Sequence, residues 1–289
     1  MRLTHYVTSI ALAAAMPLMT PHPSAAAITA EQDGAAKINI SGRQRMLTQR
    51  MAAAACFIAI GVQPDEQTGV LTQARDLYAN SLAGLASGNA DMGMLLETDE
   101  QVLAEIKRVG SLWKDFSLQV EISLNGDPSA ALVLMELSVP ILQQSDRVVK
   151  ALVASRGASG GLSPEMARTI DLAGRQRMLS QRIAKSACAM QGAMFPELAA
   201  EELTVAKQEF DAALIALEAG TDGVVAPPTP EIAAQLEIVR THWGVVQGPL
   251  DEILGGALLS ADEMAAIADK TSELLREMNK AVGMYEASS

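Results

Sequence analysis

Residues 42–50 read GRQRMLTQR, and residues 174–182 read GRQRMLSQR. Eight of the nine positions are identical, only Thr48 and Ser180 differ, and the two copies lie 132 residues apart. Each copy carries three arginines, although the formal net charge of the chain is −12. A near-identical peptide at such a distance indicates an internal duplication. The sequence around the two copies should therefore show how long the repeated unit is.

The duplication extends well beyond the nonapeptide. The segment from Ile38 to Gly61 runs parallel to the segment from Ile170 to Gly192, and Cys56 and Cys188 keep the same spacing. The spacing is also kept by three large side chains of each copy: Tyr78, Leu82 and Leu85 against Phe210, Leu214 and Leu217. The sequence therefore predicts two homologous units, 28–157 and 163–289, divided by the small residues Gly157 to Gly161.

The composition favours helices. Aromatic residues make up only 3% of the chain, whereas the helix formers Ala, Leu, Met and Glu are abundant. We expect four helices in each unit, at 29–60, 66–87, 98–124 and 128–155 and at 163–191, 197–219, 230–254 and 261–286. Pro140 falls inside the fourth of these and predicts a kink or a break. The predicted fold is all-α, with two tandem four-helix bundles forming a pseudo-dimer.

The N-terminus has the layout of a secretory signal peptide. Arg2 precedes an apolar run from Val7 to Met19, and Ala25 to Ala27 supply the small residues of a cleavage site. Cleavage after Ala27 would remove residues 1–27 and export the rest to a bacterial periplasm. An uncleaved N-terminal anchor is the alternative. No later segment has the roughly 20 consecutive apolar residues of a spanning helix.

Several classes of function are disfavoured. The net charge of −12 argues against nucleic acid as a partner. After signal-peptide removal His242 is the single histidine, and the chain lacks GxGxxG, P-loop and GxSxG patterns. We therefore expect no enzyme, no metal site and no cofactor. The 15 methionines and the Trp113/Trp243 pair are interpreted as core packing, with copper binding or a cofactor box as the weaker alternatives.

The arginines of the repeat do not share one side of the helix. At about 100° per residue, Arg45 lies opposite Arg43 and Arg50. The side of Arg45 otherwise carries small residues, and a stripe of small side chains lets a second helix approach closely. If the two stripes face each other, Arg45 meets Arg177, and a shared planar oxyanion would relieve the repulsion between them. Gly42 and Gly174 would let that anion approach the backbone.

A surface ion pair is the simplest alternative for any of these arginines, because acidic residues are abundant. We favour that interpretation for Arg43, Arg50, Arg175 and Arg182. For Arg45 and Arg177 the small-residue stripe favours the anion site, because burying an isolated guanidinium without an anion is costly.

The two cysteines share the stripe, each 11 residues after the arginine, or about 16 Å along the helix. If the first helices of the two units pair in parallel, Cys56 and Cys188 face each other. An even cysteine count in an exported protein is compatible with a disulfide. Two small buried thiols are the alternative.

The repeated nonapeptide resembles the signature of the PilJ-type N-terminal domain of type IV pili methyl-accepting chemotaxis transducers. It is also similar to the periplasmic P-box of nitrate/nitrite sensor histidine kinases. The resemblance implies four-helix bundles that dimerise through the first helix, with one arginine from each subunit holding the anion. It places that arginine on Arg45 and Arg177, and the second P-box arginine on Arg50 and Arg182.

Two features depart from these families. Family members continue into a transmembrane helix and a signalling module, whereas this sequence ends at Ser289 with neither. The residues around Arg45 also match the PilJ-type pattern better than the nitrate-sensor pattern, so nitrate or nitrite is the leading ligand rather than an assigned one.

The sequence thus predicts an exported sensory module that binds a small anion between its two repeats. We expect it to relay occupancy to a separate partner, such as a membrane receptor or sensor kinase. The alternative is a structural or interaction protein of the cell envelope that binds no ligand.

Overall fold

The computed structural model describes residues 28–156, 164–221 and 223–288. The predicted signal peptide and the divider from Gly157 to Gly161 lie outside these ranges, and the boundaries of the two units remain predictions. The described residues form eight α-helices and one short 3-10 helix: α1 (Ala30–Ala59), α2 (Pro64–Ser87), η1 (Ala90–Met92), α3 (Glu100–Leu124), α4 (Ala130–Arg156), α5 (Pro164–Gln191), α6 (Pro196–Ala219), α7 (Pro230–Leu254) and α8 (Ala261–Ala287).

The helix ends follow from local chemistry. Thr29 and Ser260 close capping boxes, in which the hydroxyl accepts an N–H of the first turn and the third helical residue bonds back. Gly88 and Gly220 end α2 and α6 at φ +80° and +73°, a conformation that L side chains rarely adopt. Because such signals are short-range, the eight expected helices are found with their ends within two residues of prediction.

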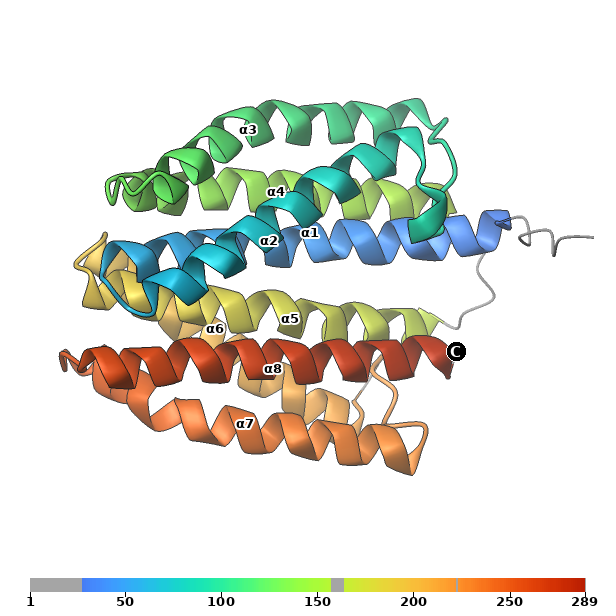
Figure 1. Ribbon diagram of the computed structural model, residues 1–289. Coiled ribbons are helices and arrows are strands. Elements are labelled where there is room, and N and C mark those ends of the chain that lie inside the picture. The colour runs from blue at the N-terminus through green and yellow to red at the C-terminus, as the bar shows by residue number, and fades with distance from the viewer. Residues whose placement is uncertain (1–27, 157–163, 222, 289) are drawn as a thin grey trace, which may run out of the picture.

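The two bundles repeat one arrangement. In the first, α1 packs against α2 and α4, and α3 packs on α4; in the second, α5 packs against α6 and α8, and α7 packs on α8. Helices α1 and α5 lie side by side and run in the same direction at the centre of the molecule (Figure 1). The predicted all-α pseudo-dimer is therefore present, joined through the first helix of each repeat.

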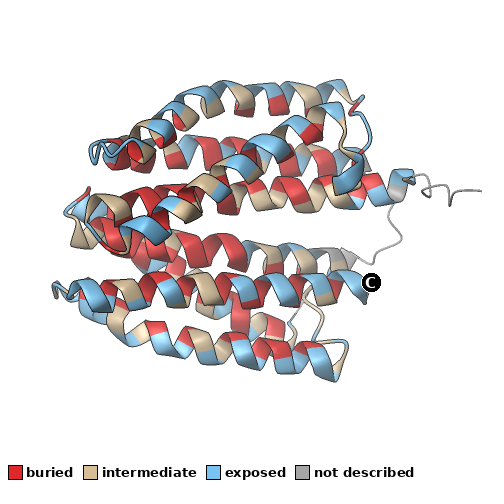
Figure 2. Ribbon diagram, viewed as in Figure 1, coloured by how far each residue is buried: buried red, intermediate tan, exposed pale blue. Residues whose placement is uncertain are grey.

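Buried residues follow the inward faces of both bundles and are densest where α1 meets α5 (Figure 2). The aromatic residues belong to these cores: the rings of Tyr78 and Trp113 stack at 4.3 Å, and those of Phe210 and Trp243 lie 4.5 Å apart. Their recurrence at equivalent places is accounted for by packing.

Pro140 does not end α4, which continues from Ala130 to Arg156. The expected break is absent. Proline removes one helical N–H, and α4 packs against α1 and α3, contacts that stabilise the helix despite the missing bond. Across the described ranges, none of the helices has an apolar stretch long enough to cross a membrane.

Candidate functional site

The first helices of the two repeats, α1 and α5, pack against each other. The small residues of the two stripes, among them Ala52 and Ala55 on α1 and Ala184 and Ala187 on α5, are buried. Arg45 on α1 reaches Asp171 on α5, and Arg177 on α5 reaches Asn39 on α1. The arginine that the sequence analysis assigned to the stripe of each repeat thus contacts the other repeat.

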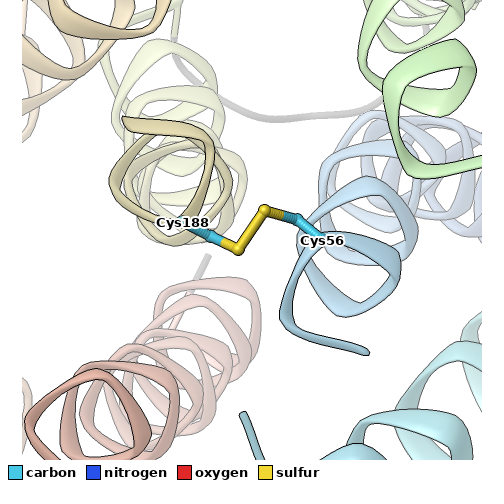
Figure 3. Close-up of a disulfide and its surroundings, with 2 residues drawn as sticks. All are labelled: Cys56 and Cys188. Carbon is cyan, nitrogen blue, oxygen red and sulfur yellow. A yellow bond between two sulfur atoms is a disulfide. The ribbon is translucent and has the colours of Figure 1, made fainter. Parts of the chain in front are cut away.

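A disulfide joins the two stripes. Cys56 on α1 and Cys188 on α5 are fully buried, with Cα atoms 6.1 Å apart and a bond between their sulfur atoms (Figure 3). The structure contains the bridge rather than two separate thiols. It closes a loop of 132 residues and ties the two bundles together covalently.

The first glutamine of each nonapeptide points away from the interface, into its own bundle. Gln44 donates through Nε2 to the carbonyl of Tyr78 on α2 at 3.1 Å and to the hydroxyl of Ser81. Gln176 donates in the same way to the carbonyl of Phe210 on α6 at 2.7 Å. These residues fix the first helix of each repeat against the second.

The second glutamine fixes the same helix against the fourth. Gln49 donates to the carbonyl of Ser138 on α4, and Gln181 donates to that of Thr271 on α8, at 3.4 and 3.2 Å. These roles were not predicted from the sequence, although the identity of both glutamines in the two copies was a signal. The nonapeptide is therefore a packing motif as well as a candidate ligand site.

Arg45 is neutralised by two carboxylates. Its Nη1 donates to Asp146 on α4 at 2.7 Å, and its Nη2 donates to Asp171 on the neighbouring α5 at 3.3 Å. The side chain is 12% exposed. Burial raises the pKa of Asp146, but the hydrogen bond from Lys150 and the charge of Arg45 more than offset this, and the pKa lies below its usual range.

Arg177 has the same geometry with uncharged partners. Its Nη1 contacts Asn279 Oδ1 on α8 at 3.4 Å, its Nη2 contacts Asn39 Oδ1 on α1 at 3.3 Å, and its Nε contacts the carbonyl of Gly174 at 3.3 Å. The residue is only 7% exposed. These contacts are longer than the 2.7–3.2 Å of a typical N–H···O bond, so each holds the guanidinium weakly.

The charge on Arg177 is correspondingly destabilised. Burial lowers its pKa to about 10, against the attraction of Glu286, and the nearby charges of Arg43 and Arg45 lower it further. The positive charges of Arg43 and Arg45 thus both disfavour the charged form of Arg177.

The glycines of the motif lie beside the arginine side chains. A Cβ atom on Gly42 would contact Arg45 Nη2 at 3.6 Å, and one on Gly174 would contact Arg177 Nη2 at 3.3 Å. A Cβ atom on Gly42 would be tolerated at that distance, whereas one on Gly174 would crowd the Arg177 guanidinium. The expected approach of an anion to this backbone remains a prediction.

The surface-ion-pair interpretation holds for one of the four remaining arginines. The exposed Arg175 pairs with the partly buried Glu209 at 3.1 Å. For the other three it is wrong within the described residues: Arg50 bonds to Gln181 at 3.1 Å, and the Nε atoms of Arg43 and Arg182 are buried without a hydrogen-bond partner. Burial lowers the pKa of both Arg43 and Arg50. Packing against neighbouring helices covers side chains that a lone helix would expose.

Arg50 and Arg182 do not join the other arginines. In the described ranges neither makes a hydrogen bond to Arg45, Arg177 or their partners. Their assignment as ligand-binding residues stays a prediction. Over the same ranges, no three His, Cys, Asp or Glu side chains are grouped so as to hold a metal ion.

Comparison with known proteins identifies the duplicated unit. Residues 27–135 and 163–278 match the family described as the type IV pili methyl-accepting chemotaxis transducer N-terminal domain. A stretch of 130 residues is 35% identical to the methyl-accepting chemotaxis protein McpN of Pseudomonas aeruginosa strain PAO1. That stretch covers 45% of this chain and 23% of the curated relative, so the chain is comparable with a minor part of that protein.

Proposed function

Because the chain belongs to the family of type IV pili methyl-accepting chemotaxis transducer N-terminal domains, we propose that it is a sensory module for a small anion. The anion would bind between α1 and α5, at Arg45 and Arg177. The observation that supports this most directly is Arg177, a buried cation whose hydrogen-bond partners are uncharged oxygens held at long distances.

An oxyanion that replaced these partners would bind the Arg177 guanidinium more strongly than they do. Charge-assisted bonds to a guanidinium are shorter and about twice as strong as bonds to neutral acceptors. The planar fork of arginine matches a planar oxyanion, which makes nitrate or nitrite the leading ligand. The two repeats supply in one chain the two arginines that a dimer would supply from two subunits.

Another protein would respond to whether the anion is bound. The family to which the chain belongs consists of parts of chemotaxis transducers, so we propose that anion binding changes the affinity for a signalling partner, such as a membrane receptor or sensor kinase. Such coupling is reciprocal, and the partner would change the affinity for the anion by the same factor. We place the module in the periplasm, on the evidence of its signal-peptide-like N-terminus.

Thermal melting against nitrate, nitrite, sulfate, chloride and small carboxylates at fixed ionic strength tests the proposal. A ligand at 100 times its dissociation constant is expected to stabilise the fold by about 2.7 kcal/mol. The Arg45→Ala/Arg177→Ala double variant should lose that response. Arg175→Ala is the matched control, because Arg175 lies on α5 but pairs with Glu209 away from the site.

A flat response to the whole panel, or an unchanged response in the double variant, would contradict the anion site. The first outcome would favour the interaction protein, which uses the same bundle without a ligand.

A further inference from the structure

The two halves of the arginine site are equivalent in position but differ in charge. Arg45 and Arg177 are related by the repeat, and so are the residues that they contact. Asp171 stands where the other half has Asn39, 132 residues earlier, and Asp146 stands where the other half has Asn279, 133 residues later. Asp and Asn have the same shape, so the duplication kept the geometry and changed only the charge.

The difference decides which arginine needs a ligand. In the first half, Asp146 lies 2.7 Å from Arg45 and acts as a built-in carboxylate ligand. In the second half, the amide oxygens of Asn39 and Asn279 leave the charge of Arg177 in place. An asparagine amide also carries two N–H donors, which an oxyanion can use, whereas an ionised aspartate offers acceptors only and repels the oxyanion.

The charge count sets the class of ligand. In the first half, Arg45 and Lys150 pair with the two carboxylates of Asp146 and Asp171, so the charges balance. In the second half, Arg177 bonds to uncharged oxygens, and Glu286 attracts it without forming an ion pair with it. Among the described residues, Arg177 is thus a single positive charge without a bonded counter-charge, which a monoanion matches and a dianion exceeds.

We propose that the anion site is one-sided: Arg177, Asn39 and Asn279 hold a single planar monoanion, while Asp146 and Asp171 occupy the Arg45 half and exclude dianions. This inference rests on the proposed function and adds to it the bound half and the residues that set specificity. It predicts one anion per chain, held away from the pseudo-twofold axis and nearer α5 and α8.

The proposal is tested with variants in which Asp and Asn are exchanged in one half of the site. The purified proteins are titrated calorimetrically with sodium nitrate and with sodium sulfate. The Asn39→Asp/Asn279→Asp variant gives Arg177 the partners that Arg45 has, and its affinity for nitrate should fall by about 100-fold or more. The Asp146→Asn/Asp171→Asn variant should gain at least about tenfold in affinity for sulfate relative to nitrate, because two negative charges leave the site.

Single substitutions separate the two arginines. Arg177→Gln should weaken nitrate binding by about 100-fold or more, whereas Arg45→Gln should change it by less than about tenfold. Circular dichroism melting checks that each variant is folded. If a double variant does not fold, Asn39→Asp and Asn279→Asp are titrated separately, since each adds a single carboxylate to the Arg177 half.

The outcomes distinguish the two proposals. A wild-type protein that binds nitrate, but loses equal affinity with Arg45→Gln and Arg177→Gln, has a shared symmetric site, and the one-sided inference is then wrong. Unchanged nitrate binding in the Asn39→Asp/Asn279→Asp variant would overturn it as well. A wild-type protein that binds no anion in the panel overturns the proposed function, and the inference with it.

Discussion

Replacing Cys56 and Cys188 by alanine is expected to lower the free energy of unfolding by about 3–5 kcal/mol. The bridge closes a loop of 132 residues, and a cross-link over a loop of that length removes much of the conformational entropy of the unfolded chain. Urea denaturation of the oxidised wild type and of the variant, followed by circular dichroism, measures the difference.

Reductant supplies the control. Reduction should bring the wild type down to the stability of the variant and leave the variant unchanged, because the variant has no bridge to lose. Titration of free thiols in denatured, unreduced protein should find none in the wild type. Two free thiols, or equal stability of variant and oxidised wild type, would show that the bridge is not formed.

The position of the bridge bears on the sensory role. The cysteines lie near the C-terminal ends of α1 and α5, 11 residues or about 16 Å beyond Arg45 and Arg177. The bridge holds that end of the helix pair together. A rearrangement of α1 against α5 on anion binding would therefore be largest at the N-terminal ends of the two helices.

Lys37→Met is expected to destabilise the protein by about 3–5 kcal/mol. The Lys37 side chain is 0% exposed, and its Nζ lies 3.1 Å from both Asp33 and Glu97. Removing the ammonium leaves two carboxylates buried close together without their shared cation. Those carboxylates also accept hydrogen bonds from the backbone N–H groups of Leu95, Thr98 and Asp99. The destabilisation should therefore extend to the segment between η1 and α3.

The second repeat provides a matched comparison. At the position equivalent to Lys37 it has Thr169, whose hydroxyl accepts the N–H of Val225 at 2.9 Å without any charge. Thr169→Val should cost only about 1–3 kcal/mol, the value of one unsatisfied buried group. The triple change Asp33→Asn/Lys37→Met/Glu97→Gln should recover much of the loss caused by Lys37→Met alone. Equal costs for Lys37→Met and Thr169→Val would show that the buried charges are not the cause.

The duplication explains why the two halves of the arginine site could diverge. In a dimer of identical chains a substitution appears in both halves, whereas a fused repeat can change one half alone. The pairs Asp146/Asn279 and Asp171/Asn39 are differences of this kind. Lys185 is another, because it forms a buried ion pair with Glu202 where the first repeat has Ala53 and Val70.

The sequence by itself determined the helical class, the two repeats and the helix boundaries. It also determined which side of the first helix carries Arg45, the small residues and Cys56. All of these depend on composition, on near-identity over a fixed spacing and on the 3.6-residue period of the helix, which are local properties of the chain.

The tertiary structure decided which groups each of these side chains contacts. Arg45 meets Asp146 across 101 residues, Arg177 meets Asn39 across 138 residues, and Lys37 meets Glu97 across 60 residues. The period of a helix fixes the direction of a side chain, but the group that it reaches depends on how neighbouring helices pack, and no local pattern contains that information. Packing therefore decided that the arginine of one repeat is neutralised while that of the other is left with uncharged partners.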